Sequence, residues 1–343
     1  MHKLRGGVYR VPKVELSEVG SLAFDQFAAI FQCRSRQWES QWSATESKQL
    51  GFGTITLLNE SLDLGDLPFE SSGLEQASHL WRFQFHYHEF LLRELALLQS
   101  QTSKKNVATD AAFIKDFLLN WARHHAPEHR SPKGDVWHPY CLSRRIPVWC
   151  QLLHELDFGS SERDELSGSL IQQGICLEQH LEFDICGNHL MENLRGLGYV
   201  YSLGLRSTDE IRLSRFFEIL KPEANVQVLK SGEHFEKSPM YHCQVTWIFL
   251  ELAWLFKSID QRIAEFCQTV AERMVDFLLK ICHPDGEIPL FSDSCFGEAP
   301  DVRSICSFAS LQGIDVSQCD RSRPTQVSFV SDYWMVDHPG GKT

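Results

Sequence analysis

The segment from Gly232 to His242 concentrates side chains that can exchange protons. It contains two Glu, two His, one Lys and one Tyr, and an apolar stretch follows it directly. Ser238 and Pro239 predict that a helix begins here, because serine caps helix N-termini and proline fits the first helical position. Tyr241 then falls in the first turn, where the partial positive charge of the helix favours a bound anion and an ionised phenol.

Tyr241 is the member of this segment best suited to catalysis. A Tyr next to a His at a helix N-terminus can act as a general acid and base if its pKa is lowered. The alternative interpretation makes Tyr241 a half-buried aromatic residue whose hydroxyl bonds the backbone. If the segment forms a site, three more of its side chains are candidates for substrate contacts: His234, Glu236 and His242.

A second polar group occupies residues 187–192, with the sequence GNHLME. On a helix that begins near Gly187, its polar side chains fall within one turn, and His189 and Glu192 share a face because they are three residues apart. Glu192 could then bond one imidazole nitrogen and set the tautomer of His189. In the structural alternative, Asn188 caps the helix and Glu192 pairs with Arg195.

A third group combines aromatic and cationic side chains at the start of another predicted helix, around residues 137–146. Arg144 and Arg145 could grip a carboxylate or a sulfate, because a guanidinium matches such groups with two hydrogen bonds. Trp137 and Tyr140 could provide a platform on which a sugar ring stacks. The alternative makes both Arg residues surface residues paired with acids.

The elements that must position these groups are almost all helices. Hydrophobic periodicity and turn residues predict consecutive helices joined by short connections, with one short strand near the N-terminus at residues 52–58. Such a run favours an all-α fold of helix hairpins, and helices that are apolar on several sides favour two layers in an incomplete (α/α) toroid. An open solenoid is the alternative, although the chain has no fixed repeat. The predicted helices are 14–32, 79–100, 110–125, 140–156, 162–183, 187–203, 209–220, 239–256 and 259–281.

The C-terminal segment has a different pattern. Residues 326–336 alternate polar and apolar side chains like one strand, and residues 338–341 resemble a hairpin turn. A single strand after a helical domain lacks a pairing partner, so we expect it to begin a β-sandwich domain that is truncated. The predicted organisation is an N-terminal extension at 1–78, a toroid domain at 79–322 and the start of a β domain at 323–343.

Composition and charge restrict the partners. The net charge of −12 argues against nucleic acid, because phosphate binding needs a basic face. Eleven Cys without a Cys-x-x-Cys pair argue against a disulfide framework and a zinc site, and His86 and His88 are too differently oriented on a helix to share a metal. We therefore expect no metal and no cofactor. The N-terminus lacks an apolar core, so we expect no signal peptide and no membrane span.

Taken in order, the motifs resemble the N-terminal part of the heparinase II/III-type polysaccharide lyases, a group that includes alginate lyases. The resemblance covers the chain from about residue 81 to its end. It rests on the segments WHPY at 137–140, SRRI at 143–146, GNH at 187–189, GEHFEKSPMYH at 232–242 and GEIPLFSDS at 286–294.

The resemblance implies β-elimination at a uronic acid of an acidic polysaccharide. It implies that Asn188 and His189 neutralise the uronate carboxylate, that Tyr241 is the general acid and, for some linkages, the base, and that Glu192 matches a Glu found in some members. It also implies a second catalytic His, and in some members a metal, from a β domain that follows the toroid. Without that domain, we expect the chain to be weakly active or inactive.

Two other functions stay open at this point. One is a non-catalytic carbohydrate-binding protein of surface-polysaccharide biosynthesis. The other is a toroid glycoside hydrolase, which needs two facing carboxylates, with Glu192, Glu236 and Asp293 as candidates. The Cys residues and the N-terminus favour the cytoplasm, whereas the resemblance favours the periplasm. The sequence does not specify the polysaccharide or the oligomeric state.

Overall fold

The structure is a computed structural model of the chain, and it describes residues 21–41, 54–65, 69, 72–101, 111–126, 134–185, 187–204, 210–283, 285–317, 326–330 and 333–337. The predicted helix start at residue 14 and the turn predicted at 338–341 lie outside these ranges. The nine Cys residues within them are free thiols, and most are buried. None of the helices described is long and apolar enough to cross a membrane.

The described part of the chain is mainly helical, with two separate two-stranded sheets. In chain order its elements are α1 (Ser21–Gln41), β1 (Thr54–Leu57), β2 (Glu60–Asp63), α2 (Ser72–Gln76), α3 (His79–Tyr87), α4 (Glu89–Gln101), α6 (Ala112–His124), η5 (Asp135–Trp137), α7 (Pro139–Glu155), α8 (Ser160–Gln179), α9 (His189–Ser202), α10 (Glu210–Gln227), α11 (Pro239–Phe256), α12 (Gln261–Ile281), α13 (Val302–Leu311), β3 (Gln326–Val330) and β4 (Tyr333–Asp337).

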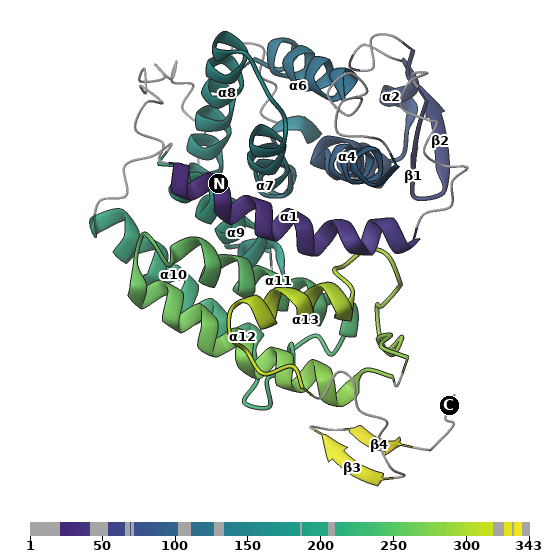
Figure 1. Cartoon of the computed structure of the whole chain (residues 1–343), viewed down its shortest axis with the longest axis vertical. Coiled ribbons are helices and arrows are strands. Elements are labelled where there is room, and N and C mark those ends of the chain that lie inside the picture. Colours follow the sequence, from purple (N-terminus) through teal and green to yellow (C-terminus); the bar gives the residue numbers. More distant parts are fainter. Residues whose placement is uncertain are drawn as a thin grey trace.

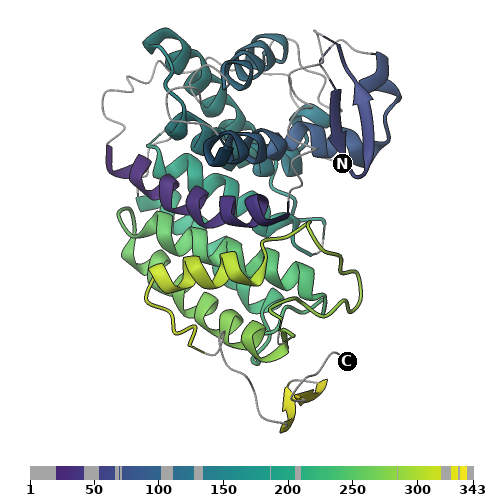
Figure 2. The ribbon, with the colours of Figure 1, turned by 45° about the vertical axis from the view of Figure 1, so that its right-hand side comes forward.

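Helix α1 crosses the middle of the molecule between two groups of helices. The group containing α4, α6, α7 and α8 lies on one side of it, and the group of α10 to α13 lies on the other (Figures 1 and 2). Helix α1 contacts α4 and α7 of the first group and α11 and α13 of the second. It therefore connects the two groups of helices.

Helix α11 forms part of an inner layer. All of its side chains are buried except those of Tyr241 and Trp254, because α9, α12 and α13 pack around it. Helix α12 covers it with one apolar face and exposes the other, which is typical of an outer helix. The predicted two-layer arrangement of hairpins therefore matches the structure.

Close helix packing fixes the position of α9 between α7 and α11. A methyl group added at Gly196 would lie 2.9 Å from the Ser143 Cα atom, and one at Gly198 would lie 2.6 Å from a Leu252 methyl carbon. Only residues without a side chain allow these helices to approach so closely. Because α9 begins at His189, this packing also fixes the first turn that carries the predicted site residues.

Three predicted elements differ from the structure. The helix predicted at 79–100 is broken at His88, whose left-handed backbone (φ 62°) separates α3 from α4. The strands predicted at 52–58 and 326–336 are each an antiparallel hairpin, β1–β2 and β3–β4, so the C-terminal strand is not without a partner. Helix α13 was not predicted, since its ten residues are too short for a clear period.

Candidate active site

The loop before α11 is held in place by its own histidines. The His234 backbone N–H donates to the Nδ1 atom of His242 at 3.3 Å, and His242 Nε2 lies 2.9 Å from the Met274 carbonyl oxygen. Both imidazoles are buried, which lowers the pKa of His234 to about 3 and that of His242 to about 4. The prediction that they contact substrate is therefore wrong, and their role is to shape the loop that leads to Tyr241.

Tyr241 lies in the first turn of α11, as the Ser-Pro start predicts. Ser238 caps this helix through its hydroxyl, which accepts from the Tyr241 N–H at 3.3 Å. The phenol donates to Asp293 Oδ2 at 3.0 Å. Burial, this hydrogen bond and the nearby negative charge raise the pKa of Tyr241 to about 12, so the expectation of an ionised phenol is wrong.

Asn188 and Tyr140 are brought together by Gln244, which lies one turn after Tyr241 on α11. The Asn188 amide donates to Gln244 Oε1 at 2.6 Å, and the Tyr140 hydroxyl also interacts with the Gln244 side chain. Asn188 occupies the cap position of α9 but makes no side-chain cap hydrogen bond, so its amide is directed to α11 instead. Within the described residues the amide makes this one donation, so its second N–H is left for another acceptor.

His189 packs between an aromatic ring and a carboxylate. Its ring lies against that of Tyr140, with centroids 4.3 Å apart, and its Nδ1 atom is 3.1 Å from Glu182 Oε1. The side chain keeps 30% of its surface exposed. Glu182, and not the predicted Glu192, therefore bonds the imidazole.

Glu236 links the His189 end of the site to the Tyr241 end. Its exposed side chain extends over Gly187, where an added methyl group would come within 2.9 Å of Glu236 Oε1. Partial burial and repulsion from Asp293 raise the pKa of Glu236, whereas His189 opposes the rise. Glu236 also interacts electrostatically with Tyr241. We call the group of Asn188, His189, Tyr241, Tyr140 and Glu236 the candidate site.

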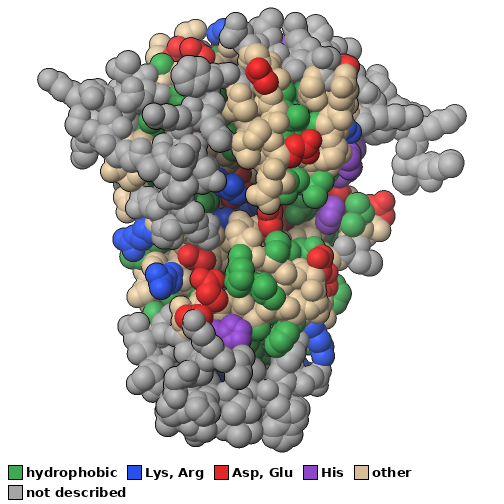
Figure 3. Space-filling view, turned by 90° about the vertical axis from the view of Figure 1, so that its right-hand side faces the viewer, with side chains coloured by type: hydrophobic (Ala, Val, Ile, Leu, Met, Phe, Trp, Pro, Cys, Tyr) green, Lys and Arg blue, Asp and Glu red, His purple; other side chains and the backbone are tan. Residues whose placement is uncertain are grey.

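The loop of residues 285–301, which carries Asp293, lies on the right-hand side of Figure 1, and that side faces the viewer in Figure 3. Basic and acidic side chains lie in a hollow at mid-height on this face, and His and hydrophobic side chains border it. Ser238 ties this loop to α11, since its hydroxyl also lies 3.0 Å from the Asp293 carbonyl oxygen. The loop and the helix start therefore hold Tyr241 and its carboxylate partner together.

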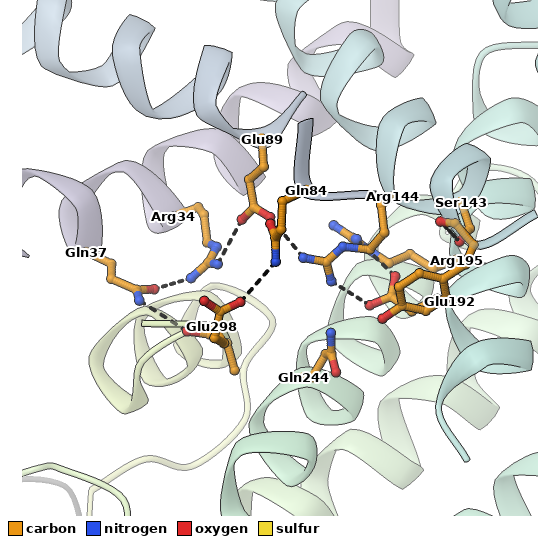
Figure 4. Close-up of polar contacts among 12 residues, drawn as sticks. Arg34, Gln37, Gln84, Glu89, Ser143, Arg144, Glu192, Arg195, Gln244 and Glu298 are labelled. Atoms are coloured by element: carbon orange, nitrogen blue, oxygen red, sulfur yellow. Dashed lines mark hydrogen bonds and ion pairs between the residues drawn. The ribbon is translucent and has the colours of Figure 1, made fainter. Parts of the chain in front are cut away.

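Glu192 and Arg144 belong to a buried row of alternating charges (Figure 4). Arg144 donates to Glu192 at 2.8 Å and to Glu89 at 2.9 Å, while Glu192 also accepts from Arg195 at 3.2 Å. The Glu192 side chain is only 1% exposed. Its prediction as a substrate contact and as the partner of His189 is wrong, and the alternative pairing with Arg195 is confirmed.

The row continues in both directions across the helical array. Arg34 of α1 donates to Glu89 at 3.1 Å, and Arg195 forms an ion pair with Glu251 of α11. Burial would raise the pKa of Glu89, but the neighbouring guanidinium groups outweigh it and hold that pKa far below its usual range. These side chains line a small cavity of about 40 Å³, which Gln244 also lines but His189 and Tyr241 do not. Arg144 is therefore engaged with carboxylates of the protein rather than free to grip a substrate.

Arg145 and Trp137 are also part of the interior. Arg145 is fully buried, donates to the carbonyl oxygens of His86 and Val136 at 2.9 Å each, and lies over the Trp121 ring. Trp137 is 8% exposed and packs in the main core. The predictions of an anion grip at Arg145 and a sugar platform at Trp137 are wrong, because neither side chain presents a free face to solvent.

Sequence analysis did not assign three neighbours of the site to the roles that the structure gives them, namely Glu182, Gln244 and Asp293. The sequence offered Asp293 as a hydrolase carboxylate and not as the partner of Tyr241. Gln244 lies three residues after Tyr241, a spacing that places both on one helix face and could have indicated it. Glu182 lies in a loop, so no periodic signal connects it to His189.

The fold and the site define a class of protein, namely an array of paired helices with an Asn, a His and a Tyr at one mouth. The family model described as the heparinase II/III N-terminus matches residues 42–311, and the chain belongs to this family. Helix α1 precedes the matched residues. The helical toroid predicted from the sequence is thereby confirmed.

Similar proteins are longer than this chain. A heparin-sulfate lyase of Pedobacter heparinus is 30% identical over 228 residues, which cover 63% of this chain and 34% of that protein. A heparin-sulfate lyase of Bacteroides stercoris is 35% identical over 80 residues, which cover 22% of this chain and 12% of that protein. The crystal structure of the heparan sulfate lyase HepC from Pedobacter heparinus has a TM-score of 0.51 at 18% identity and covers 82% of this chain and 42% of that one. A heparinase III structure has a TM-score of 0.51 at 16% identity, and the match covers 92% of this chain and 48% of that one. The chain thus spans about a third of its first curated relative.

Proposed function

We propose that this chain is the helical portion of a polysaccharide lyase that cleaves an acidic polysaccharide by β-elimination at a uronic acid. The observation that carries the proposal is the meeting of Asn188, His189 and Tyr241 around shared neighbours, Gln244 and Glu236. The names of its relatives, heparin-sulfate lyases, support an acidic polysaccharide as the substrate.

The chemistry needs a neutralised carboxylate, because the proton on C5 of a uronate is very weakly acidic. The free N–H of the Asn188 amide and the ring of His189 can donate to that carboxylate and stabilise the enolate-like intermediate. Each prealigned donor contributes about 3 kcal/mol to such a developing charge. A base then takes the C5 proton, the C4–C5 double bond forms, and the bond from C4 to the glycosidic oxygen breaks.

Tyr241 fits the role of the acid that protonates the departing oxygen. With its pKa at about 12, the phenol is protonated at neutral pH, and only about one molecule in 10⁵ carries the phenolate. Such a group almost always carries the proton that the departing alkoxide oxygen needs, and it is rarely available as a base. We therefore assign the base to a group outside the described residues, and the resemblance suggests the histidine of a following β domain.

The domain organisation is part of the proposal. Residues 79–322 form the toroid domain, residues 1–78 an extension, and residues 323–343 the start of a β domain. The β3–β4 hairpin and the greater length of the relatives support this division. Helix α1 nevertheless packs into the array, so we expect the extension to be needed for stability.

The test is incubation of the protein, in the longest form that its gene encodes, with uronate polymers. β-Elimination leaves an unsaturated uronate that absorbs in the ultraviolet. Tyr241→Phe and His189→Ala should each lower the rate at least about 10²-fold, since each removes a proton donor. Full activity in both variants would refute the assigned site.

Two other outcomes would replace the proposal. New reducing ends without ultraviolet absorbance would indicate hydrolysis, for which Glu236 and Asp293 are the carboxylates left after Glu192 is found in ion pairs. Binding of an acidic oligosaccharide with no product after long incubation would indicate the non-catalytic carbohydrate-binding protein.

A further inference from the structure

We propose that Glu182 is a positioning residue that keeps a proton on Nδ1 of His189 and so turns Nε2 toward the substrate carboxylate, to which Nε2 donates when the ring is protonated. The inference rests on the proposed function for its catalytic consequence, but its structural part can be tested without any turnover. Nothing in the motifs of the chain pointed to Glu182.

The Glu182 carboxylate is held on two sides. Oε1 lies 3.1 Å from His189 Nδ1, and Oε2 accepts from the Asn193 amide at 2.9 Å. The backbone N–H of Glu182 donates to Asn193 Oδ1, also at 2.9 Å. Asn193 thus grips both the backbone and the side chain of a residue that is 5% exposed, and this clamp fixes which oxygen faces His189.

The Glu182 carboxylate is ionised, so it can only accept hydrogen bonds. Burial would raise the pKa of Glu182, but the hydrogen bonds from His189 and Asn193 outweigh burial and hold that pKa below its usual range. An ionised carboxylate has no proton to donate. The hydrogen bond to His189 therefore requires a proton on Nδ1.

A second histidine near Glu182 does not compete for this role. His138 Nδ1 lies 4.0 Å from Glu182 Oε1, but the same nitrogen accepts the Tyr140 backbone N–H at 3.2 Å as the cap of α7. A ring nitrogen that accepts carries no proton. His189 is therefore the imidazole of the two that donates to Glu182.

Among the residues that the structure describes, none forms a hydrogen bond with Nε2 of His189, which leaves this nitrogen for the substrate. The Tyr140 ring lies against its face, and Glu236 acts on it electrostatically from the loop before α11. When the ring is protonated, the buried negative charge of Glu182 stabilises it, and Nε2 becomes a charged donor suited to a carboxylate. The Asp of a Ser-His-Asp triad fixes the tautomer and the orientation of its imidazole in the same way.

The decisive experiment observes the ring nitrogens of His189 by NMR of the ¹⁵N-histidine-labelled chain, with His189→Gln used to assign its signals. The neutral wild-type ring should carry its proton on Nδ1. In Glu182→Gln, the new amide must turn its oxygen toward the Asn193 donor, so its NH₂ faces Nδ1 and moves the His189 proton to Nε2. Glu178→Gln, which loses an ion pair with Arg212 without touching His189, should leave the tautomer unchanged.

The outcomes separate the two proposals. A wild-type ring with its proton on Nε2, or the same tautomer in wild type and Glu182→Gln, would overturn the role of Glu182 whether or not the protein is active. The wild-type signal suffices if the variant fails to fold. In the elimination assay, Glu182→Gln should lower kcat by about 10² to 10³ with little change in KM, because the neutral amide no longer stabilises the protonated ring that donates to the substrate carboxylate. If the wild type is active and Glu182→Gln inverts the tautomer without lowering kcat, the catalytic role of Glu182 is overturned. An inactive wild type would count against the proposed function alone.

Discussion

The buried row of charges provides the sharpest test of how this site is supported, and the variant of choice is Glu192→Gln. Glu192 neutralises Arg144 and Arg195, and its side chain is only 1% exposed. The substitution keeps the size of the side chain and removes its charge. Two buried guanidinium groups then share less negative charge, although Glu89 and Glu251 remain beside them.

The expected loss of stability is about 3 to 5 kcal/mol, which is the usual cost of removing one partner from a buried ion pair. Unfolding entropy for 343 residues is roughly 0.7 kcal/mol/K, so Tm should fall by about 4 to 7 °C. Calorimetry or circular dichroism at constant pH measures this shift. The matched control is Glu265→Gln on the exposed face of α12, for which we expect less than about 1 °C.

The two interpretations of Glu192 predict different results. If Glu192 supports the fold, Glu192→Gln lowers Tm, and binding of an acidic oligosaccharide at low temperature changes little. If Glu192 contacts the substrate, Tm stays close to that of the wild type and binding is lost. The second result would refute the structural role argued from the ion pairs.

Three further predictions concern the phenol, a buried imidazole and a helix contact. Asp293→Asn should lower the pKa of Tyr241 from about 12 toward the ordinary value of a phenol, because it removes the negative charge beside the hydroxyl, and NMR of ¹³C-labelled tyrosine measures the change. His242 is buried with a pKa of about 4, so the unfolded chain takes up a proton at this residue before the folded chain does as the pH falls. The free energy of unfolding should therefore decrease by about 3 kcal/mol between pH 6.5 and 4. Urea unfolding should show a correspondingly weaker pH dependence for His242→Gln. Gly196→Ala should cost about 1 to 3 kcal/mol because its methyl group would meet the Ser143 backbone, whereas Gly168→Ala in α8, with nothing within 4 Å, should stabilise by about 0.5 to 1 kcal/mol; equal effects of the two in urea unfolding would contradict the packing argument.

The features confirmed from the sequence are those that local rules govern. The start of α11 follows from Ser238 and Pro239, whose cap geometry needs no distant partner. The run of helices follows from apolar periodicity, and the two-layer arrangement follows from helices that are apolar on several sides. The break at His88 was not predicted, since neither Gly nor Pro stands there; in the structure its left-handed backbone accompanies a fully buried ring that accepts a hydrogen bond from the Trp149 indole.

The sequence determined which residue types are available to the candidate site, and it placed Asn188, His189 and Tyr241 at two helix starts. It could not determine which charges are neutralised, because an ion pair joins residues that are far apart in the chain. Only the tertiary structure decided that Glu192 and Arg144 bond each other 48 residues apart, and that a loop carboxylate, Glu182, bonds His189 instead. The tertiary structure also determines the protonation of Tyr241, since partial burial and the neighbouring Asp293 keep its phenol protonated.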